Sequence, residues 1–152
     1  MSKKNAISKY LELMEAAKAY CSAEKVYLSE PEQVADYIRP TYLGQEQEIV
    51  SVLYLNTRNH LLGVHTATIG LANSSQLHPR EVFREAIVNN ASRIIVCHNH
   101  PSGDVTPSAQ DISMTKQLLE SGKIIGIELI DHLVISGKDT GFTSLRKLGH
   151  IS

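Results

Sequence analysis

An uninterrupted apolar run, from Ile94 to Cys97, is the feature that most restricts what this chain can fold into. A short strand without polar alternation is typical of a sheet that is buried on both faces. Amphipathic helical patterns stand on either side of it, beginning at Pro79 and Pro107, and proline favours the first turn of a helix. Strands that alternate with helices in this way predict an α/β fold, with a mixed β-sheet flanked by helices.

The other helices and strands follow from the hydrophobic period and the turn residues. The predicted helices cover residues 5–22, 29 or 30 to 39, 79–89 and 107–122, and the predicted strands cover residues 49–55, 61–69, 94–97, 124–129 and 133–135. Residues 72–75 are predicted as a loop. Thr106 is the expected N-cap of the last helix, Gly122 its stop signal, and Pro40 the end of the second helix.

We divide the chain into an N-terminal amphipathic helix within residues 1–28 and one domain over residues 29–152. The helix carries an apolar stripe, with its charged residues turned away. The stripe consists of Ile7, Leu11, Met14, Ala17 and Cys21. We expect it to pack on the chain's own core or on a second copy, which would form a homodimer, because a polar face of mixed charge argues against a membrane.

Composition excludes several classes of protein. The 152 residues suffice for one self-supporting core, and 15 basic against 16 acidic residues give a net charge of -1 with no basic stretch for a phosphate backbone. Cys21 and Cys97 lie far apart, in a predicted helix and a buried strand, which argues against a disulfide scaffold. The chain shows neither a signal peptide nor a membrane-spanning apolar run, so we expect a soluble cytoplasmic protein.

Metal-binding side chains gather directly after the apolar run. His98 and His100 lie two residues apart on one strand and therefore project from the same face, while Asn99 points the opposite way. The polar loop that follows contains glycine and proline, so it can turn back and bring Asp111 beside them. Two imidazoles and one carboxylate leave a coordination position open, as is typical of catalytic Zn²⁺. Such a site favours hydrolysis of an amide-type bond.

Ser108 stands three residues before Asp111, on the same face of the predicted helix. Its hydroxyl could stabilise a developing oxyanion, and a carboxylate general base would also be needed. The simpler alternative is that the histidines are scattered and that Thr106, Ser108 and Asp111 only cap a helix.

The spacing of these residues resembles a known family. His98-x-His100-Pro101, followed after six residues by Ser108-x-x-Asp111, resembles the JAMM motif of the MPN (JAB) metalloproteases. The surrounding segments, 78–81, 98–103 and 131–132, resemble its bacterial RadC-like (UPF0758) branch. The resemblance implies a cytidine-deaminase-like, three-layer fold and a peptide or protein substrate. It also implies zinc held by His98, His100 and Asp111, with Ser108 near the reacting carbonyl.

The family resemblance further implies a catalytic glutamate before the first strand of the sheet. Glu48 directly precedes the apolar run over residues 49–55 and is the residue that we assign to this role. Two alternatives remain. Glu46 lies two residues earlier on the same predicted strand face, and Glu81 opens the helix before the histidine strand.

A second interpretation is a non-catalytic module that keeps the JAMM fold and binds DNA, in a repair-associated role, or a protein. Relative to full-length RadC proteins the helix-hairpin-helix region is missing or reduced here, so we place DNA binding below hydrolysis. The letters His-Asn-His match the HNH nucleases only superficially. A zinc deaminase would need a Pro-Cys-x-x-Cys segment, which this chain lacks.

Three nearby residues have expected roles in or around the site. His132 could support a ligand through a hydrogen bond or make a structural contact at the end of the sheet, and the structural contact is the stronger expectation. Cys97 is expected in the core, on the face opposite the ligands. Gly103 is expected to adopt a backbone conformation that other residues reach only at a cost.

Overall fold

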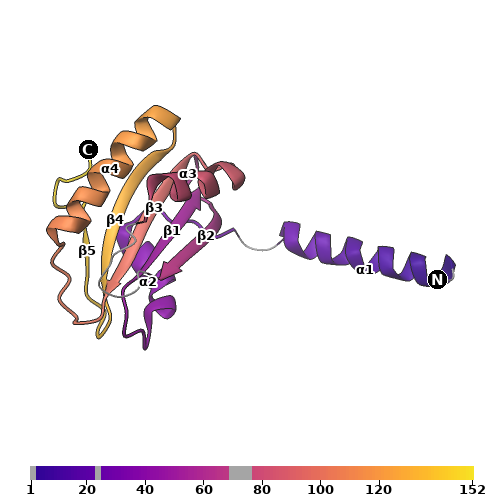
Figure 1. Cartoon of the computed structure of the whole chain (residues 1–152). Helices are drawn as coiled ribbons and strands as arrows, with labels where there is room; N and C mark the ends of the chain where they lie inside the picture. The colour runs from indigo at the N-terminus through magenta and orange to yellow at the C-terminus, as the bar shows by residue number, and fades with distance from the viewer. Residues whose placement is uncertain (1–2, 23–24, 69–76) are drawn as a thin grey trace.

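The computed structural model describes residues 3–22, 25–68 and 77–152 (Figure 1). These residues form the helices α1 (Lys3–Ser22), α2 (Pro31–Tyr42), α3 (Pro79–Val88) and α4 (Ala109–Ile125). They also form the strands β1 (Ile49–Leu55), β2 (Leu61–Thr68), β3 (Arg93–His100), β4 (Glu128–Ser136) and β5 (Phe142–Ser144). The predicted loop over 72–75, the predicted strand end at Ile69 and the side chain of Cys21 lie outside the described residues.

One mixed sheet forms the centre of the domain, with the strand order β2-β1-β3-β4-β5. β1 pairs antiparallel with both β2 and β3, and β4 pairs antiparallel with β5. β3 and β4 are parallel and are joined through α4, because a parallel pair needs a crossover connection. β3 is therefore the central strand, and its carboxyl end carries the predicted ligands.

Helices cover both faces of the sheet (Figure 1). On one face, Ile38 of α2 shares a core with Leu53 of β1. On the other face, Phe83 of α3 and Leu118 of α4 share a second core with Val96 of β3. The structure confirms the predicted α/β class, with a mixed sheet flanked by helices in three layers.

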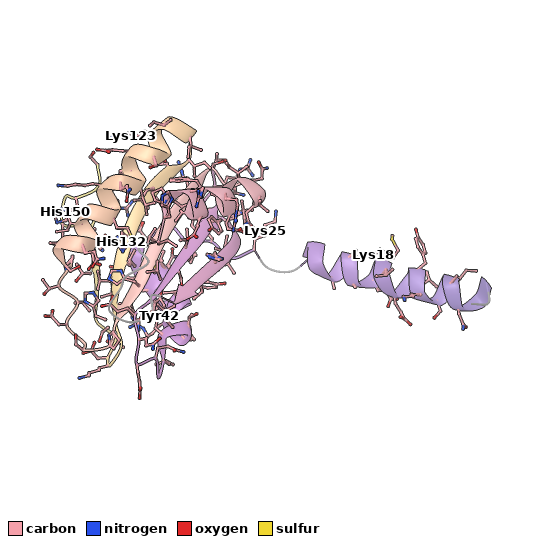
Figure 2. All side chains as sticks on the ribbon, viewed as in Figure 1. Lys18, Lys25, Tyr42, Lys123, His132 and His150 are labelled. Atoms are coloured by element: carbon pink, nitrogen blue, oxygen red, sulfur yellow. The ribbon has the colours of Figure 1, made fainter. Side chains whose placement is uncertain are left out.

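α1 stands clear of the sheet domain, as do its side chains in Figure 2. Residues 5–19 are all exposed; Ile7 is 62% exposed and Leu11 is 56% exposed. The stripe therefore does not pack on the chain's own core within the described residues, and its packing on a second copy stays a prediction. No helix in the described part of the chain is both long enough and apolar enough to cross a membrane.

The last helix begins and ends later than predicted. Ser108, rather than Thr106, is the N-cap, and its hydroxyl accepts a hydrogen bond from the Asp111 amide at 3.0 Å. Gly122 lies inside α4 rather than at its end. Gly126, with a φ of 83°, forms the C-cap in the left-handed region that glycine adopts without strain.

β4 is a single strand, Glu128–Ser136, and the two short strands predicted over 124–129 and 133–135 are wrong in number and in their first boundary. Ile124 and Ile125 belong to the last turn of α4. Their β-branched side chains favour strands by propensity, but the helix continues until its glycine cap.

Two further differences arise from tertiary contacts. The second helix continues through Pro40 to Tyr42, and burial of Tyr42, only 1% exposed, offsets the hydrogen bond that proline cannot donate. β5 has no counterpart in the prediction, because three residues carry no periodic signal. Its Ser144 hydroxyl donates to the buried Asp131 carboxylate at 2.6 Å, which ties the strand to β4.

Gly122 tests the packing of α4 against the domain. A Cβ at this position would lie 2.3 Å from the Ile127 carbonyl oxygen and 3.4 Å from the Phe83 ring. We expect Gly122→Ala to lower the free energy of unfolding by roughly 1–3 kcal/mol through overpacking, although alanine is the better helix former. Chemical denaturation measures the difference.

Ile124→Ala is the control, because this side chain in the same helix is 88% exposed. It should change the free energy of unfolding little. A Gly122→Ala variant as stable as the wild type would contradict the close approach of α4 to the chain that follows it.

Candidate metal centre

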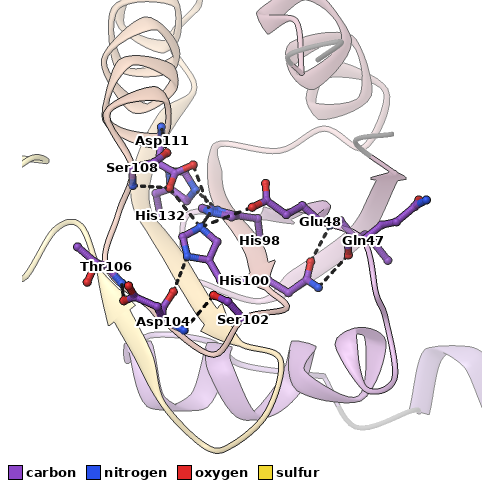
Figure 3. A network of polar contacts seen from close by, with 12 residues as sticks. Gln47, Glu48, His98, His100, Ser102, Asp104, Thr106, Ser108, Asp111 and His132 are labelled. Carbon is purple, nitrogen blue, oxygen red and sulfur yellow. Dashed lines mark hydrogen bonds and ion pairs between the residues drawn. The ribbon is translucent and has the colours of Figure 1, made fainter. Parts of the chain in front are cut away.

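Two elements bring the predicted ligands together at one end of the sheet (Figure 3). His98 and His100 lie at the carboxyl end of β3, and Asp111 lies in the first turn of α4. One ligand atom of each residue lies within 4.8 Å of the others. The three residues therefore form a cluster that could hold a metal ion.

The distances between the ligand atoms suit a tetrahedral ion. His98 Nε2 lies 3.0 Å from His100 Nε2 and 3.2 Å from Asp111 Oδ1. His100 Nε2 lies 3.4 Å from Asp111 Oδ2. Ligand atoms bound to a tetrahedral Zn²⁺ would lie about 3.3 Å apart, given metal–ligand bonds of about 2.0 Å. Two nitrogens and one oxygen are also donors that zinc accepts, so the residues present fit this ion.

The loop after β3 orients His100. Its Nδ1 donates a hydrogen bond to the Asp104 carbonyl at 2.6 Å, so the Nε2 atom of a neutral ring carries the lone pair and faces Asp111. Gly103 has a φ of 88°, which confirms the predicted need for glycine, and its amide donates to the His100 carbonyl. The loop thus sets both the turn and the orientation of this ligand.

A capping box holds the carboxylate ligand at the start of α4. The Ser108 hydroxyl accepts from the Asp111 amide at 3.0 Å, and the Ser108 amide donates to Asp111 Oδ2 at 2.8 Å. The capping role and the metal-binding role, which the sequence presented as alternatives, are therefore compatible in one carboxylate. Ser108 is exposed beside the cluster.

The cluster attracts positive charge. Burial by itself would raise the pKa of Asp111, but its contacts with His100 and His98 outweigh burial and hold that pKa well below its ordinary value. The contact with Asp111 raises the pKa of His100. Burial lowers the pKa of His132 to about 3, helped by the charge that His98 can carry, so the His132 ring is neutral at physiological pH.

Glu48 lies at the edge of this cluster. Its Oε1 is 4.0 Å from His100 Nε2, and its side chain is 49% exposed. The prediction that Glu46 shares a strand face with Glu48 is wrong, because both residues precede β1 and the chain bends between them. Glu81 lies exposed in the first turn of α3.

Asn99 supports the segment that carries Glu48, a role that the sequence did not predict. Its buried side chain accepts a hydrogen bond from the Ile49 amide at 2.6 Å and donates one to the Gln47 carbonyl at 3.0 Å. These backbone groups flank Glu48, so one carboxamide holds the chain on both sides of it. A polar residue inside a buried strand was the available signal, because buried amides need partners. Cys97, two residues earlier on the same face of β3, lies in the core opposite the predicted ligands, as expected, and shares that core with α2.

His132 also contributes to the site. Its Nε2 lies 2.8 Å from His98 Nδ1, so hydrogen-bond support of a ligand is the alternative that the structure shows. Thr115 lies on the other side of the ring, with its hydroxyl 2.7 Å from His132 Nδ1, and nothing in the sequence pattern singled it out. The neighbouring Asp131 has a separate role, accepting hydrogen bonds from Ser144 and from the His132 amide.

Known proteins share this sequence pattern. A family model described as the RadC-like JAB domain matches residues 28–150. The chain belongs to the RadC-like JAB domain family. It is 43% identical over 134 residues to a UPF0758 protein of Clostridium tetani, and 41% identical over 149 residues to one of Shouchella clausii. A UPF0758 protein of Bacillus cereus is 50% identical over 121 residues. The resemblance found in the motif is confirmed.

These relatives are longer than the chain. The three matches cover 88%, 98% and 80% of this chain but 59%, 64% and 53% of the relatives. This RadC-like JAB domain therefore corresponds to between half and two thirds of their length. Their names state no activity, so the function is argued from the site.

Asn99→Ala tests how the Glu48 segment is held. The substitution removes both hydrogen bonds and leaves the buried Ile49 amide without a partner. We expect the free energy of unfolding to fall by roughly 1–3 kcal/mol, measured by chemical denaturation. Asn56→Ala is the matched control, because the Asn56 side chain likewise makes two hydrogen bonds to the backbone, accepting both from amides, but in a turn that water reaches. Equal losses in the two variants would contradict a special role for Asn99.

Proposed function

We propose that this protein is a zinc-dependent hydrolase of amide bonds, a metallopeptidase or isopeptidase of the JAMM type. The observation that carries the proposal is the cluster of His98, His100 and Asp111, with the half-exposed Glu48 carboxylate 4.0 Å from His100. Membership of the RadC-like JAB domain family supports it. A peptide or a protein is the proposed substrate.

His98, His100 and Asp111 would hold the zinc ion. When bound, zinc lowers the pKa of water at its open position to about 7 and polarises a carbonyl. Two neutral imidazoles and a single carboxylate compensate only part of the ion's charge. Because only three protein ligands are present, this donor set suits a catalytic ion better than a structural one, which usually has four protein ligands.

Glu48 is the proposed general base and general acid. Its carboxylate would accept a proton from the attacking water and then donate it to the leaving amine nitrogen. Half exposure lets the side chain reach both the cluster and a substrate. The two hydrogen bonds of Asn99 hold the backbone on either side of Glu48, which limits how far the carboxylate can move away.

Ser108 is the proposed oxyanion donor. Its Oγ already accepts a hydrogen bond from the Asp111 amide, and that bond does not use the hydroxyl hydrogen. The hydrogen can therefore point toward the carbonyl oxygen of a substrate at the exposed N-terminus of α4. The partial positive charge of the helix N-terminus would add to the stabilisation of negative charge there.

Zinc content tests the ligand set. We expect wild-type protein, purified without chelators and supplied with zinc, to hold close to one zinc ion per chain by elemental analysis. His100→Ala and Asp111→Ala should lose most of it, because each removes one of three ligands. His65→Ala and Asp36→Ala, outside the cluster, should keep it. A wild-type protein without zinc would contradict the proposal and favour a binding module.

Glu48→Gln separates catalysis from metal binding. We expect the variant to keep its zinc but to hydrolyse at least about 100-fold more slowly, because proton transfer by a positioned side chain contributes roughly 100- to 10,000-fold. The probe is a library of peptides and isopeptide-linked peptides, with cleavage followed by mass spectrometry. Glu46→Gln is the matched control and should cleave like the wild type. Unchanged cleavage by Glu48→Gln would rule out the assigned role.

A further inference from the structure

A buried series of hydrogen bonds connects two of the proposed metal-binding residues, His98 and Asp111, through two residues outside the cluster. The Thr115 hydroxyl donates to the Asp111 carbonyl at 2.8 Å. Thr115 Oγ1 lies 2.7 Å from His132 Nδ1, and His132 Nε2 lies 2.8 Å from His98 Nδ1. This series of hydrogen bonds therefore starts at the backbone of Asp111 and ends at the ring of His98.

In each hydrogen bond of this series, only one of the two groups can be the donor. The single hydrogen of the Thr115 hydroxyl is used on the Asp111 carbonyl, so Thr115 Oγ1 must accept from His132 Nδ1–H. A neutral His132 then carries a lone pair on Nε2, which accepts from His98 Nδ1–H. With its hydrogen on Nδ1, His98 presents the lone pair of Nε2 to the metal position.

The local charge favours the opposite tautomer of His98. Its Nε2 lies 3.2 Å from the Asp111 carboxylate, which attracts a hydrogen to that nitrogen. A hydrogen on Nε2 would block metal binding through this atom. Some other interaction must therefore hold the hydrogen on Nδ1 before the metal arrives.

We propose that Thr115 and His132 are positioning residues that fix His98 as the Nδ1–H tautomer and so prepare its Nε2 for the metal. The inference rests on the metal site of the proposed function, but not on the hydrolysis. Thr115 and His132 are fully buried and His98 is 1% exposed, so water does not replace either partner. His100 is held differently, by the Asp104 carbonyl of an exposed loop, so its tautomer does not depend on Thr115 or His132.

Thr115→Val is the test substitution, because valine keeps the shape of the side chain and removes the hydroxyl. His132 Nδ1–H would then face a methyl group, and the ring would gain by moving its hydrogen to Nε2. Nε2–H would donate to His98 Nδ1 and force the hydrogen of His98 onto Nε2. Thr115→Ser restores the hydroxyl and should restore the wild-type tautomers.

The control is Ser121→Ala, which removes a hydroxyl from the same helix. Ser121 donates to the Gln117 carbonyl at 2.8 Å, four residues earlier, as Thr115 does to Asp111, but at an exposed position away from the site. Any effect of losing a hydroxyl-to-carbonyl bond within α4 would appear in both variants. Thermal unfolding of all variants reports whether each one is folded.

Two measurements decide the proposal. The first is nitrogen-15 NMR of the histidine rings in metal-free protein at pH 8, where we expect His98 as Nδ1–H in the wild type, Thr115→Ser and Ser121→Ala, and as Nε2–H in Thr115→Val. The second is the zinc dissociation constant, measured by competition with a chelator. We expect it to rise roughly 10- to 100-fold in Thr115→Val and to stay near the wild-type value in the other two.

An Nδ1–H tautomer of His98 in folded Thr115→Val, or an unchanged zinc affinity, would overturn the positioning role. Loss of folding in Thr115→Val, with the wild-type tautomer kept in folded His132→Leu, whose side chain cannot accept from His98 Nδ1–H, would also overturn it. Failure of the proposed function looks different. Wild-type protein without zinc affinity would contradict the metal site, while the tautomers of the metal-free protein would still decide whether Thr115 and His132 fix the ring of His98.

Discussion

Alternation of side chains along β3, the central strand of a sheet covered on both faces, is the constraint on which the rest of the site depends. His98 and His100 face α4 and its Asp111, whereas Cys97 and Asn99 face α2. A slip of one residue in the pairing with β1 or β4 would exchange these faces and carry both imidazoles into the α2 core. The apolar layers that bury β3 thus protect the register, and the register holds the ligands.

Asn99 and His132 are tolerated in this buried sheet because their hydrogen-bonding groups are used. Asn99 pairs with two backbone groups of the segment before β1, and His132 pairs with Thr115 and His98. A buried polar group without a partner costs about 1–3 kcal/mol, so these bonds stabilise the fold as well as orient the site. Asp111 also has two roles, because its carboxylate accepts the capping hydrogen bond of α4 and faces both imidazoles. The stability of the fold and the geometry of the candidate metal centre therefore depend on shared contacts.

Prediction from the sequence succeeded where the signal is local. The strand over residues 49–55 and the start of α3 at Pro79 follow from period and turn chemistry, and the structure has both. It failed where packing overrides propensity. Glycine often ends a helix, but Gly122 lies within α4. The position suits glycine for another reason, because the chain after the helix passes too close for a side chain there. β5 has too few residues to show a period and is held by contacts with β4.

The sequence by itself determined the α/β class and the three residues of the candidate metal centre, since an apolar strand, a His-x-His pair and a helix start beside them are all encoded within a few positions. Only the tertiary structure decided what surrounds the ligands. It set Glu48 beside His100, placed Asn99 next to the segment that carries Glu48, and linked His98 to His132 and Thr115 by close polar contacts. These partners come from different strands and helices, and local spacing holds no information on which side chains meet across a sheet. Pairing register and the packing of α4 bring them together.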